Sequence, residues 1–185
     1  RWNKLVETIR VHFPDLAFFH LSATGGHRFD KNISANMSRA GIGLYGISPN
    51  KALSEQIDLK PVLSVYSVVG GIKNVRQGET IGYEGLYTAT QDMVIATIPM
   101  GYYEGVEKRL LNTGVVRIHD TDCPIVGRVS MNITTVNISH LKDITLNTPV
   151  LIISDNPEHK NSIENIAKIC STSPYEILVH IREHL

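Results

Sequence analysis

The sequence has 185 residues, of which 42% are hydrophobic and 19% charged, and its 18 basic residues balance its 18 acidic ones. A chain of this size can form one domain, or one small domain with part of another, and its apolar content argues against disorder. The charge balance argues against a nucleic-acid partner, because phosphate binding needs a surplus of clustered cations. No run reaches the roughly 18 apolar residues of a membrane span.

The two cysteines, Cys123 and Cys170, are not spaced as metal ligands, and no matching histidine cluster accompanies them. We therefore expect no metal site and two reduced thiols in the core of a cytoplasmic protein. The sequence begins at Arg1 and lacks a charged and then apolar leader. We expect it to begin inside a larger protein.

Residues 1–14 carry apolar side chains at three- and four-residue spacing up to Pro14, which predicts an amphipathic helix. The apolar runs at residues 16–23 and 41–47 predict two strands buried on both faces. A helix followed by buried strands is typical of the end of a parallel barrel.

From about residue 60 the sequence changes to short β-rich runs separated by turn residues such as Gly70-Gly71, Gln77-Gly78 and Asp120. These runs lie at residues 62–69, 79–83, 86–89, 93–98, 114–118, 124–131, 134–138 and 149–154. Short strands at this spacing predict an all-β barrel or sandwich. Two terminal helices are predicted at 162–171, with Ser162 as N-cap, and at 174–185, with Pro174 in the first turn.

Considered one at a time, the candidate residues give only weak evidence for a function. Tyr83 lies between glycines on a turn between two predicted strands, where a phenol can act as an acid or base or can simply pack. The Arg39 guanidinium can bind a ring nitrogen or a phosphate, or it can form a structural ion pair. Gly41 leaves backbone N–H groups open to an anion. Thr24 follows a buried strand, at the edge where barrel enzymes place phosphate-binding loops.

Taken in order, seven segments resemble the successive motifs of alanine racemases. They are HLSAT (20–24), RAGIGLYG (39–46), LKPVLSVYSVV (59–69), GETIGYEGLYTA (78–89), IPMGYYEGVEKRLLN (98–112), PIVGRVSMN (124–132) and PYEILVHI (174–181). The resemblance extends from about residue 16 onwards. The ordered set is specific, because unrelated proteins would not reproduce seven such motifs with sensible spacings.

The resemblance implies a mainly β chain in two parts. Residues 1–50 would be the last helix and strands of a (β/α)8 barrel that binds pyridoxal 5'-phosphate. Residues 51–185 would be the C-terminal β-barrel-like domain with its terminal helices, and the boundary would lie in the polar segment 49–60. The implied parent is a cytoplasmic isomerase that interconverts L- and D-alanine for peptidoglycan synthesis. It would be a homodimer with active sites shared across the interface.

The resemblance also implies roles for individual residues. Tyr83 matches the catalytic tyrosine, which would move the α-proton on one face of an aldimine in the partner subunit while a lysine serves the other face. Arg39 matches the arginine that hydrogen-bonds the pyridine nitrogen and limits side reactions, and His20 matches the histidine that supports it. The remaining matches are the phosphate ligands Thr24, the backbone of Gly41 and Ile42, and the Tyr175 hydroxyl, with Met131 and Tyr102 near the substrate.

Three positions depart from the family pattern. Asn132 stands where an acidic residue is usual, residues 101–105 read GYYEG in place of GYADG, and Thr24 stands where serine is commoner. The change at Asn132 leaves open a racemase for serine, lysine or a broad set of amino acids.

The Schiff-base lysine of the family lies in the first strand of the barrel. The lysines of this sequence, such as Lys31, Lys60 and Lys108, are not in that motif. We therefore expect this chain alone to be inactive and to bind pyridoxal phosphate poorly. As an isolated piece it could also serve as a catalytically silent dimerisation module.

Overall fold

The computed structural model describes residues 1–26, 32–49 and 58–183. The chain divides into two compact units, residues 1–62 and 63–185. The elements of the first unit are α1 (Trp2–His12), β1 (His20–Ala23), β2 (Met37–Arg39) and η2 (Ile42–Tyr45), where η denotes a 3₁₀ helix. Those of the second are β3 (Val65–Val68), β4 (Gly71–Val75), β5 (Thr80–Ile81), η3 (Tyr83–Gly85), β6 (Tyr87–Thr88), β7 (Met93–Ile98), η4 (Lys108–Leu110), β8 (Val115–Ile118), β9 (Thr121–Pro124), β10 (Thr134–Asn137), β11 (Pro149–Ile153), α3 (Ile163–Ile169) and α4 (Pro174–His180). Within the described ranges, every helix is too short or too polar to traverse a lipid bilayer.

The first unit contains the predicted N-terminal helix followed by a parallel pair of strands. Helix α1 buries Val6, and the Trp2 indole N–H donates to the Ser34 carbonyl oxygen at 3.1 Å. Strands β1 and β2 pair in parallel, with Ala23 opposite Arg39. Because the carboxyl ends of parallel strands meet at one edge, the residues that follow β1 and β2 lie close together.

The prediction of a strand at residues 41–47 is wrong, because this run forms η2 and the strand lies before it. Gly46 explains the difference: its φ of +72° is left-handed, and a Cβ there would lie 1.7 Å from the Lys60 carbonyl oxygen. Neither this conformation nor this contact suits a regular strand. The predicted strand at 16–23 is also shorter and less buried than expected, since β1 covers His20–Ala23 and exposes three of its four residues.

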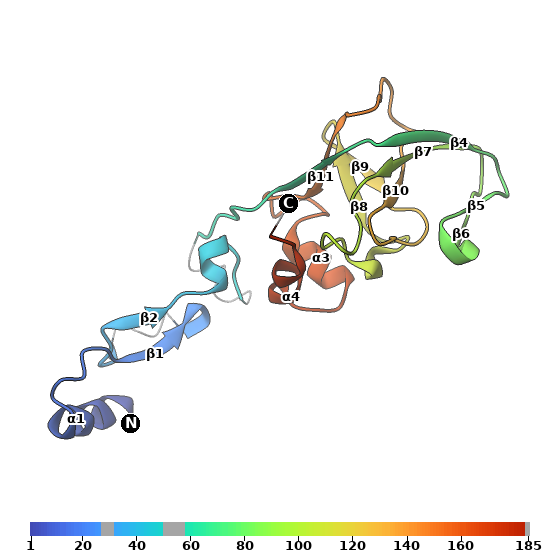
Figure 1. Cartoon of the computed structure of the whole chain (residues 1–185). Coiled ribbons are helices and arrows are strands. Elements are labelled where there is room, and N and C mark those ends of the chain that lie inside the picture. Colours follow the sequence, from blue (N-terminus) through green and yellow to red (C-terminus); the bar gives the residue numbers. More distant parts are fainter. Residues whose placement is uncertain (27–31, 50–57, 184–185) are drawn as a thin grey trace. The chain divides into compact units, whose positions relative to one another are not determined.

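The second unit is mainly β, which confirms the predicted fold class, and its two larger sheets are antiparallel. One has the strand order β10-β7-β4 and the other β3-β11-β8-β9. Figure 1 shows β4, β7 and β10 side by side. Inward-facing aliphatic residues fill the core, and one cluster consists of Val75, Ile81, Ala89, Met93, Ile95 and Val126.

In the second unit one predicted strand is wrong and two strands, β4 and β9, were not predicted. The run 124–131 contributes only Pro124 to a strand, although Val126 and Val129 are buried. Gly127 interrupts the run with a φ of +75°, so the pairing does not continue beyond an isolated antiparallel bridge between Ile125 and Val136. Strands β4 and β9 begin at Gly71 and Thr121, within or directly after sequences that are typical of turns, Gly70-Gly71 and Asp120.

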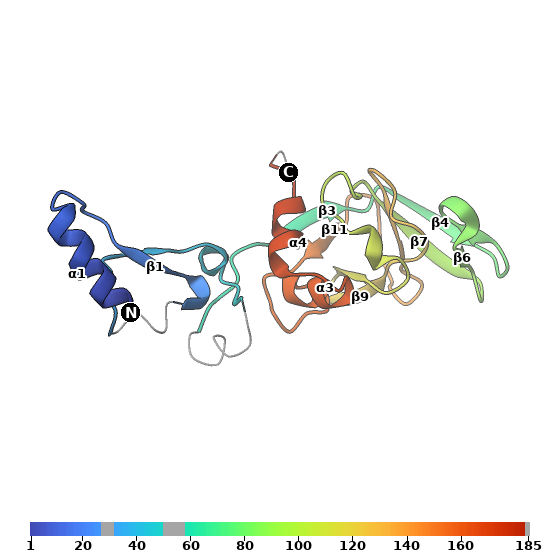
Figure 2. The ribbon, with the colours of Figure 1, turned by 90° about the horizontal axis from the view of Figure 1, so that it is seen from below.

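The two C-terminal helices begin where the sequence predicts. Ser162 caps α3 by accepting a hydrogen bond from the Asn165 N–H. Ser173, the residue before α4, caps that helix by accepting from the Glu176 N–H. Figures 1 and 2 show α3 and α4 lying against each other. Helix α4 ends at His180, earlier than predicted, and residues 184–185 lie outside the described part of the chain. It carries Tyr175 in its first turn.

Candidate functional site

The first unit brings Thr24 and the 41–43 backbone together at the carboxyl edge of the β1–β2 pair. The Thr24 hydroxyl oxygen accepts from the Gly41 N–H at 3.0 Å and from the Gly43 N–H at 3.4 Å. A Cβ at Gly43 would lie 2.7 Å from the Thr24 methyl group, whereas a Cβ at Gly41 would meet nothing within 4 Å. The space beside Gly41 is therefore open, and a hydroxyl together with the N–H groups of this turn is a combination that can bind a phosphate.

Arg39 and His20 lie at opposite ends of this strand pair. Arg39 ends β2 opposite Ala23, and its Nη2 donates to the Leu21 carbonyl oxygen at 3.1 Å. His20 begins β1 opposite Met37. Among the described residues, no hydrogen bond joins His20 to the Arg39 guanidinium. The guanidinium is exposed, at the same edge as Thr24, and is available to a ring nitrogen.

The second unit gathers three of the sequence-predicted residues, Tyr83, Tyr102 and Met131, on one open groove of about 590 Å³. They come from three separate segments of the chain. The groove is also lined by Glu84, Lys108, Arg128, Val129, Ser130, Asn132 and Ile133. The fourth predicted residue of this unit, Tyr175, does not line the groove; it is 48% exposed on α4.

Tyr83 is presented on a fixed turn. Gly82 has a φ of +78° and a Cβ there would lie 3.1 Å from the Arg128 N, so the turn lies directly on the neighbouring segment. Glu84, with a φ of +63°, forms a 2.5 Å ion pair with Arg128. The Tyr83 side chain is 70% exposed. The backbone is thus held while the phenol faces solvent and the groove.

Another part of the groove lining comes from two turns that lie against each other. The Tyr102 N–H donates to the Ser130 carbonyl oxygen at 3.0 Å, and the Tyr103 N–H donates to that of Met131 at 2.9 Å. The Lys108 ammonium lies 3.8 Å from the centre of the Tyr102 ring, within the range of a cation–π contact. These contacts hold the Tyr102 backbone against the Ser130–Met131 turn, and the Tyr102 ring against Lys108.

Sequence reasoning missed the charged residues of this groove, which are Glu84, Lys108 and Arg128. Each lies within a segment that resembles a family motif, yet no spacing rule connects Arg128 with Glu84 across more than forty positions. Only Asn132 carried a signal, as a departure from the family pattern. The structure adds its partner, Glu104, whose Oε1 accepts from the Asn132 amide at 2.7 Å.

Comparison with known proteins assigns the family. The profile described as "Alanine racemase, C-terminal domain" matches residues 62–185. The alanine racemase of Borreliella burgdorferi (strain ZS7) is 35% identical over 182 residues, covering 97% of this chain and 48% of the relative. That of Lactobacillus gasseri is 34% identical over 173 residues, covering 91% of this chain and 45% of the relative.

Solved structures of alanine racemases match the fold of this chain. The alanine racemase of Clostridium difficile 630 in complex with cycloserine matches with a TM-score of 0.86 and 30% identity, over 98% of this chain and 48% of that chain. The alanine racemase of Bartonella henselae, with covalently bound pyridoxal phosphate, gives a TM-score of 0.79 at 26% identity, over 98% of this chain and 50% of that chain. The chain belongs to the alanine racemase family. It spans about half the length of the curated relatives it matches.

Proposed function

We propose that this chain is the C-terminal part of an enzyme that interconverts L- and D-alanine, and that Tyr83 moves the α-proton on one face of the substrate. The observation that carries the proposal is the groove in which the exposed Tyr83 phenol lies beside Tyr102 and Met131. Lys108 and Arg128 line the same groove. Tyr102 and Met131 bound the space for a small side chain.

The residues that match the family's cofactor ligands would hold pyridoxal phosphate. Thr24, the backbone N–H groups of Gly41 and Ile42, and the Tyr175 hydroxyl would bind the phosphate, and Arg39 would bind the ring nitrogen. When bound, this cofactor delocalises the electron pair left by loss of the α-proton. A guanidinium stays protonated and only donates, so Arg39 would leave the ring nitrogen without a proton and thereby limit side reactions.

The active site is proposed to be shared in a cytoplasmic homodimer, with Tyr83 of one subunit acting beside the cofactor of the other. A lysine would serve the opposite face, and the sequence does not carry it in its family motif. This chain alone should therefore be inactive: after incubation with pyridoxal phosphate, gel filtration should recover protein without cofactor absorbance. A stable stoichiometric band would contradict this part of the proposal.

The decisive experiment is Tyr83→Phe in a full-length enzyme that contains this sequence. Loss of a general base typically lowers the rate by about 10²- to 10⁴-fold. The loss should be one-sided, with α-proton exchange persisting from one enantiomer by way of the lysine. Tyr66→Phe is the matched control, since Tyr66 is similarly exposed on β3 and does not line the groove. Racemisation by Tyr83→Phe at the wild-type rate would disprove the role.

Sharing between subunits has its own test. Tyr83→Phe protein mixed with a lysine-deficient variant should yield heterodimers with one intact and one doubly damaged site, and part of the activity should return. If heterodimers of confirmed composition regain nothing, the sites are not shared.

A second candidate function is a racemase for serine, lysine or a broad set of amino acids. Asn132 favours it, because a neutral amide lines the groove at this position. Comparing kcat/KM for these substrates with that for alanine separates the two candidates.

A further inference from the structure

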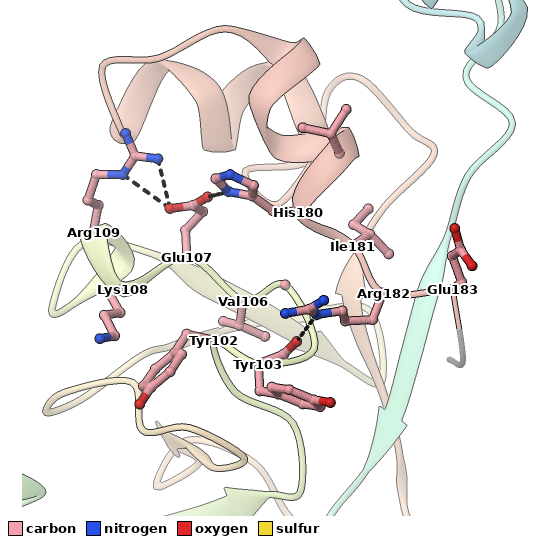
Figure 3. Close-up of a pocket in the computed structure, with 12 residues that line it drawn as sticks. Tyr102, Tyr103, Val106, Glu107, Lys108, Arg109, His180, Ile181, Arg182 and Glu183 are labelled. Carbon is pink, nitrogen blue, oxygen red and sulfur yellow. Dashed lines mark hydrogen bonds and ion pairs between the residues drawn. The ribbon is translucent and has the colours of Figure 1, made fainter.

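Glu107 is a buried acidic residue that the proposed chemistry does not use. Its side chain is 9% exposed, just before η4, and both carboxylate oxygens are engaged. Oε2 accepts from Arg109 Nη2 at 2.8 Å and Nε at 3.1 Å, and Oε1 accepts from His180 Nδ1 at 2.8 Å. Figure 3 shows the carboxylate lying between these two side chains. A burial this complete, with hydrogen-bond donors on both sides, indicates a defined role for the carboxylate.

Arg109 extends the network to the other end of helix α4. Its Nη2 also lies 2.5 Å from Glu176 Oε1, and its Nη1 donates to the Cys170 carbonyl oxygen at 3.1 Å. The hydrogen bonds to Glu107 and Glu176 raise the pKa of Arg109 above its ordinary value. Hydrogen bonds from the Thr172 hydroxyl and then from Arg109 lower the pKa of Glu176. The guanidinium and the Glu176 carboxylate thus each stabilise the charge of the other.

The network therefore reaches both ends of α4 from one segment. Glu176 directly follows Tyr175 in the first turn, and His180 is the last residue of the helix. At Gly105, which has a φ of +107°, a Cβ would lie 2.9 Å from both the His180 carbonyl oxygen and Ile181 Cα. The segment that leads from Tyr102 to Arg109 consequently lies directly on the end of α4.

A metal site is the alternative interpretation of this cluster. One ligand atom from each of Glu107, Glu176 and His180 lies within 4.8 Å of the others. The Arg109 guanidinium, however, already bonds both carboxylates. A cation would have to displace a permanently charged group that donates to both acids, so the geometry favours a structural clamp.

We propose that Glu107 is a positioning residue: through Arg109 and His180 it clamps α4 onto the segment that carries Tyr102, and so fixes the Tyr175 hydroxyl. The proposal rests on the proposed function, because it takes Tyr175 as a phosphate ligand. It links the phosphate-binding side of α4 to a wall of the Tyr83 groove through one buried carboxylate.

The test uses Glu107→Gln in a full-length enzyme that contains this sequence. The amide has one acceptor oxygen and a donor group, so it cannot accept from both Arg109 and His180 as the carboxylate does. Hydrogen exchange of the cofactor-free protein should become about tenfold faster across Ile177–Ile181 while the sheets keep their protection. The dissociation constant of pyridoxal phosphate should rise by about tenfold, the scale of one lost hydrogen bond to a charged group.

A double-mutant cycle separates positioning from general destabilisation. If Glu107 acts through Tyr175, then adding Glu107→Gln to Tyr175→Phe should weaken cofactor binding no further than Tyr175→Phe alone. Asp122→Asn is the matched control, because it breaks the 2.7 Å Arg117–Asp122 pair in the β8–β9 hairpin and leaves α4 untouched. It should change neither the dissociation constant nor exchange in α4.

The outcomes are distinguishable. The positioning role would be overturned if hydrogen exchange in α4 were unchanged in Glu107→Gln. It would also be overturned if the double variant raised the dissociation constant of pyridoxal phosphate by the product of the two single effects. If Tyr175→Phe binds the cofactor like the wild type, the phosphate role assigned to Tyr175 in the proposed function is wrong. The exchange rates in Glu107→Gln then decide separately whether the clamp exists.

Discussion

The Asn132 amide nitrogen donates to Glu104 Oε1 at 2.7 Å, and this bond joins the two segments in which the sequence departs from the alanine racemase pattern. The other oxygen of Glu104 accepts from the Gly101 N–H at 2.8 Å. Position 104 is acidic in the family's GYADG as well, so it is the amide at 132 that gives the Glu104 carboxylate a hydrogen-bond donor here. An acidic residue at 132 would bring two carboxylates together.

Asn132→Asp should accordingly destabilise the protein by about 1 kcal/mol near pH 7, the scale of one lost hydrogen bond. The loss should shrink in acid, where one carboxyl group is protonated and can donate. Adding Glu104→Gln, which supplies an amide donor on the other side, should recover stability. Urea unfolding at pH 7 and pH 4 measures all three proteins; equal stability of Asn132→Asp and wild type at pH 7 would refute this prediction.

Thr24→Val should weaken phosphate binding in the full-length enzyme. Valine has nearly the same shape but no oxygen to accept from the Gly41 and Gly43 N–H groups. We expect the dissociation constant of pyridoxal phosphate to rise by about tenfold, whereas that of pyridoxal, which has no phosphate, should stay unchanged. Thr24→Ser retains the hydroxyl and should bind like the wild type. Equal weakening for both ligands would mean that Thr24 does not act on the phosphate.

Gly105→Ala should destabilise the second unit by about 2 to 4 kcal/mol, because it combines a strained positive φ with a contact on the end of α4. Gly78→Ala is the control: Gly78 has a φ of +87°, but a Cβ there would meet nothing within 4 Å. It should cost only the conformational strain, about 1 kcal/mol. Chemical denaturation measures the free energy of unfolding of both variants. The extra destabilisation of Gly105→Ala over Gly78→Ala is the cost of the close contact with His180.

Thr172 should stabilise the second unit at neutral pH and lose this effect in acid. The folded state lowers the pKa of Glu176 below its ordinary 4.5, chiefly through the Thr172 hydroxyl. A lowered pKa means that this stabilisation is present above pH 4.5 and is lost as the pH falls through the folded pKa. Thr172→Val should therefore unfold more readily than wild type at neutral pH, and the two melting temperatures should converge in acid. If the difference between the two melting temperatures grew as the pH fell, this prediction would be wrong.

Local periodicity predicted most of the β-domain because its strands have one buried face. The run 93–98 is β7 over its full length, since every residue takes part in a regular ladder. The predictions failed where glycine determines the backbone. Gly46 turns an apolar run into η2, Gly127 interrupts another, and Gly71 begins β4 where a turn was expected. Hydropathy does not encode these conformations or close contacts.

The candidate site was predictable from motifs only as separate residues. The structure gathers Tyr83, Tyr102 and Met131 on one groove. The contacts that hold these residues in place join segments that are distant in the sequence, so motifs alone do not predict them. Glu107 had no signal at all: its two flanking partners lie 2 and 73 positions away. Most of the predicted boundary segment, residues 50–57, lies outside the described residues.

The four-stranded sheet has a consequence for how the protein is made. Its order places β3, the first strand of the second unit, directly beside β11, the last. On the ribosome β3 emerges early and then has an unpaired edge until β11 has been synthesised. Loop closure over such a distance makes folding slow, and an exposed edge invites pairing with other chains. Nascent chains arrested before β11 should therefore be the species that chaperones bind and that aggregates first.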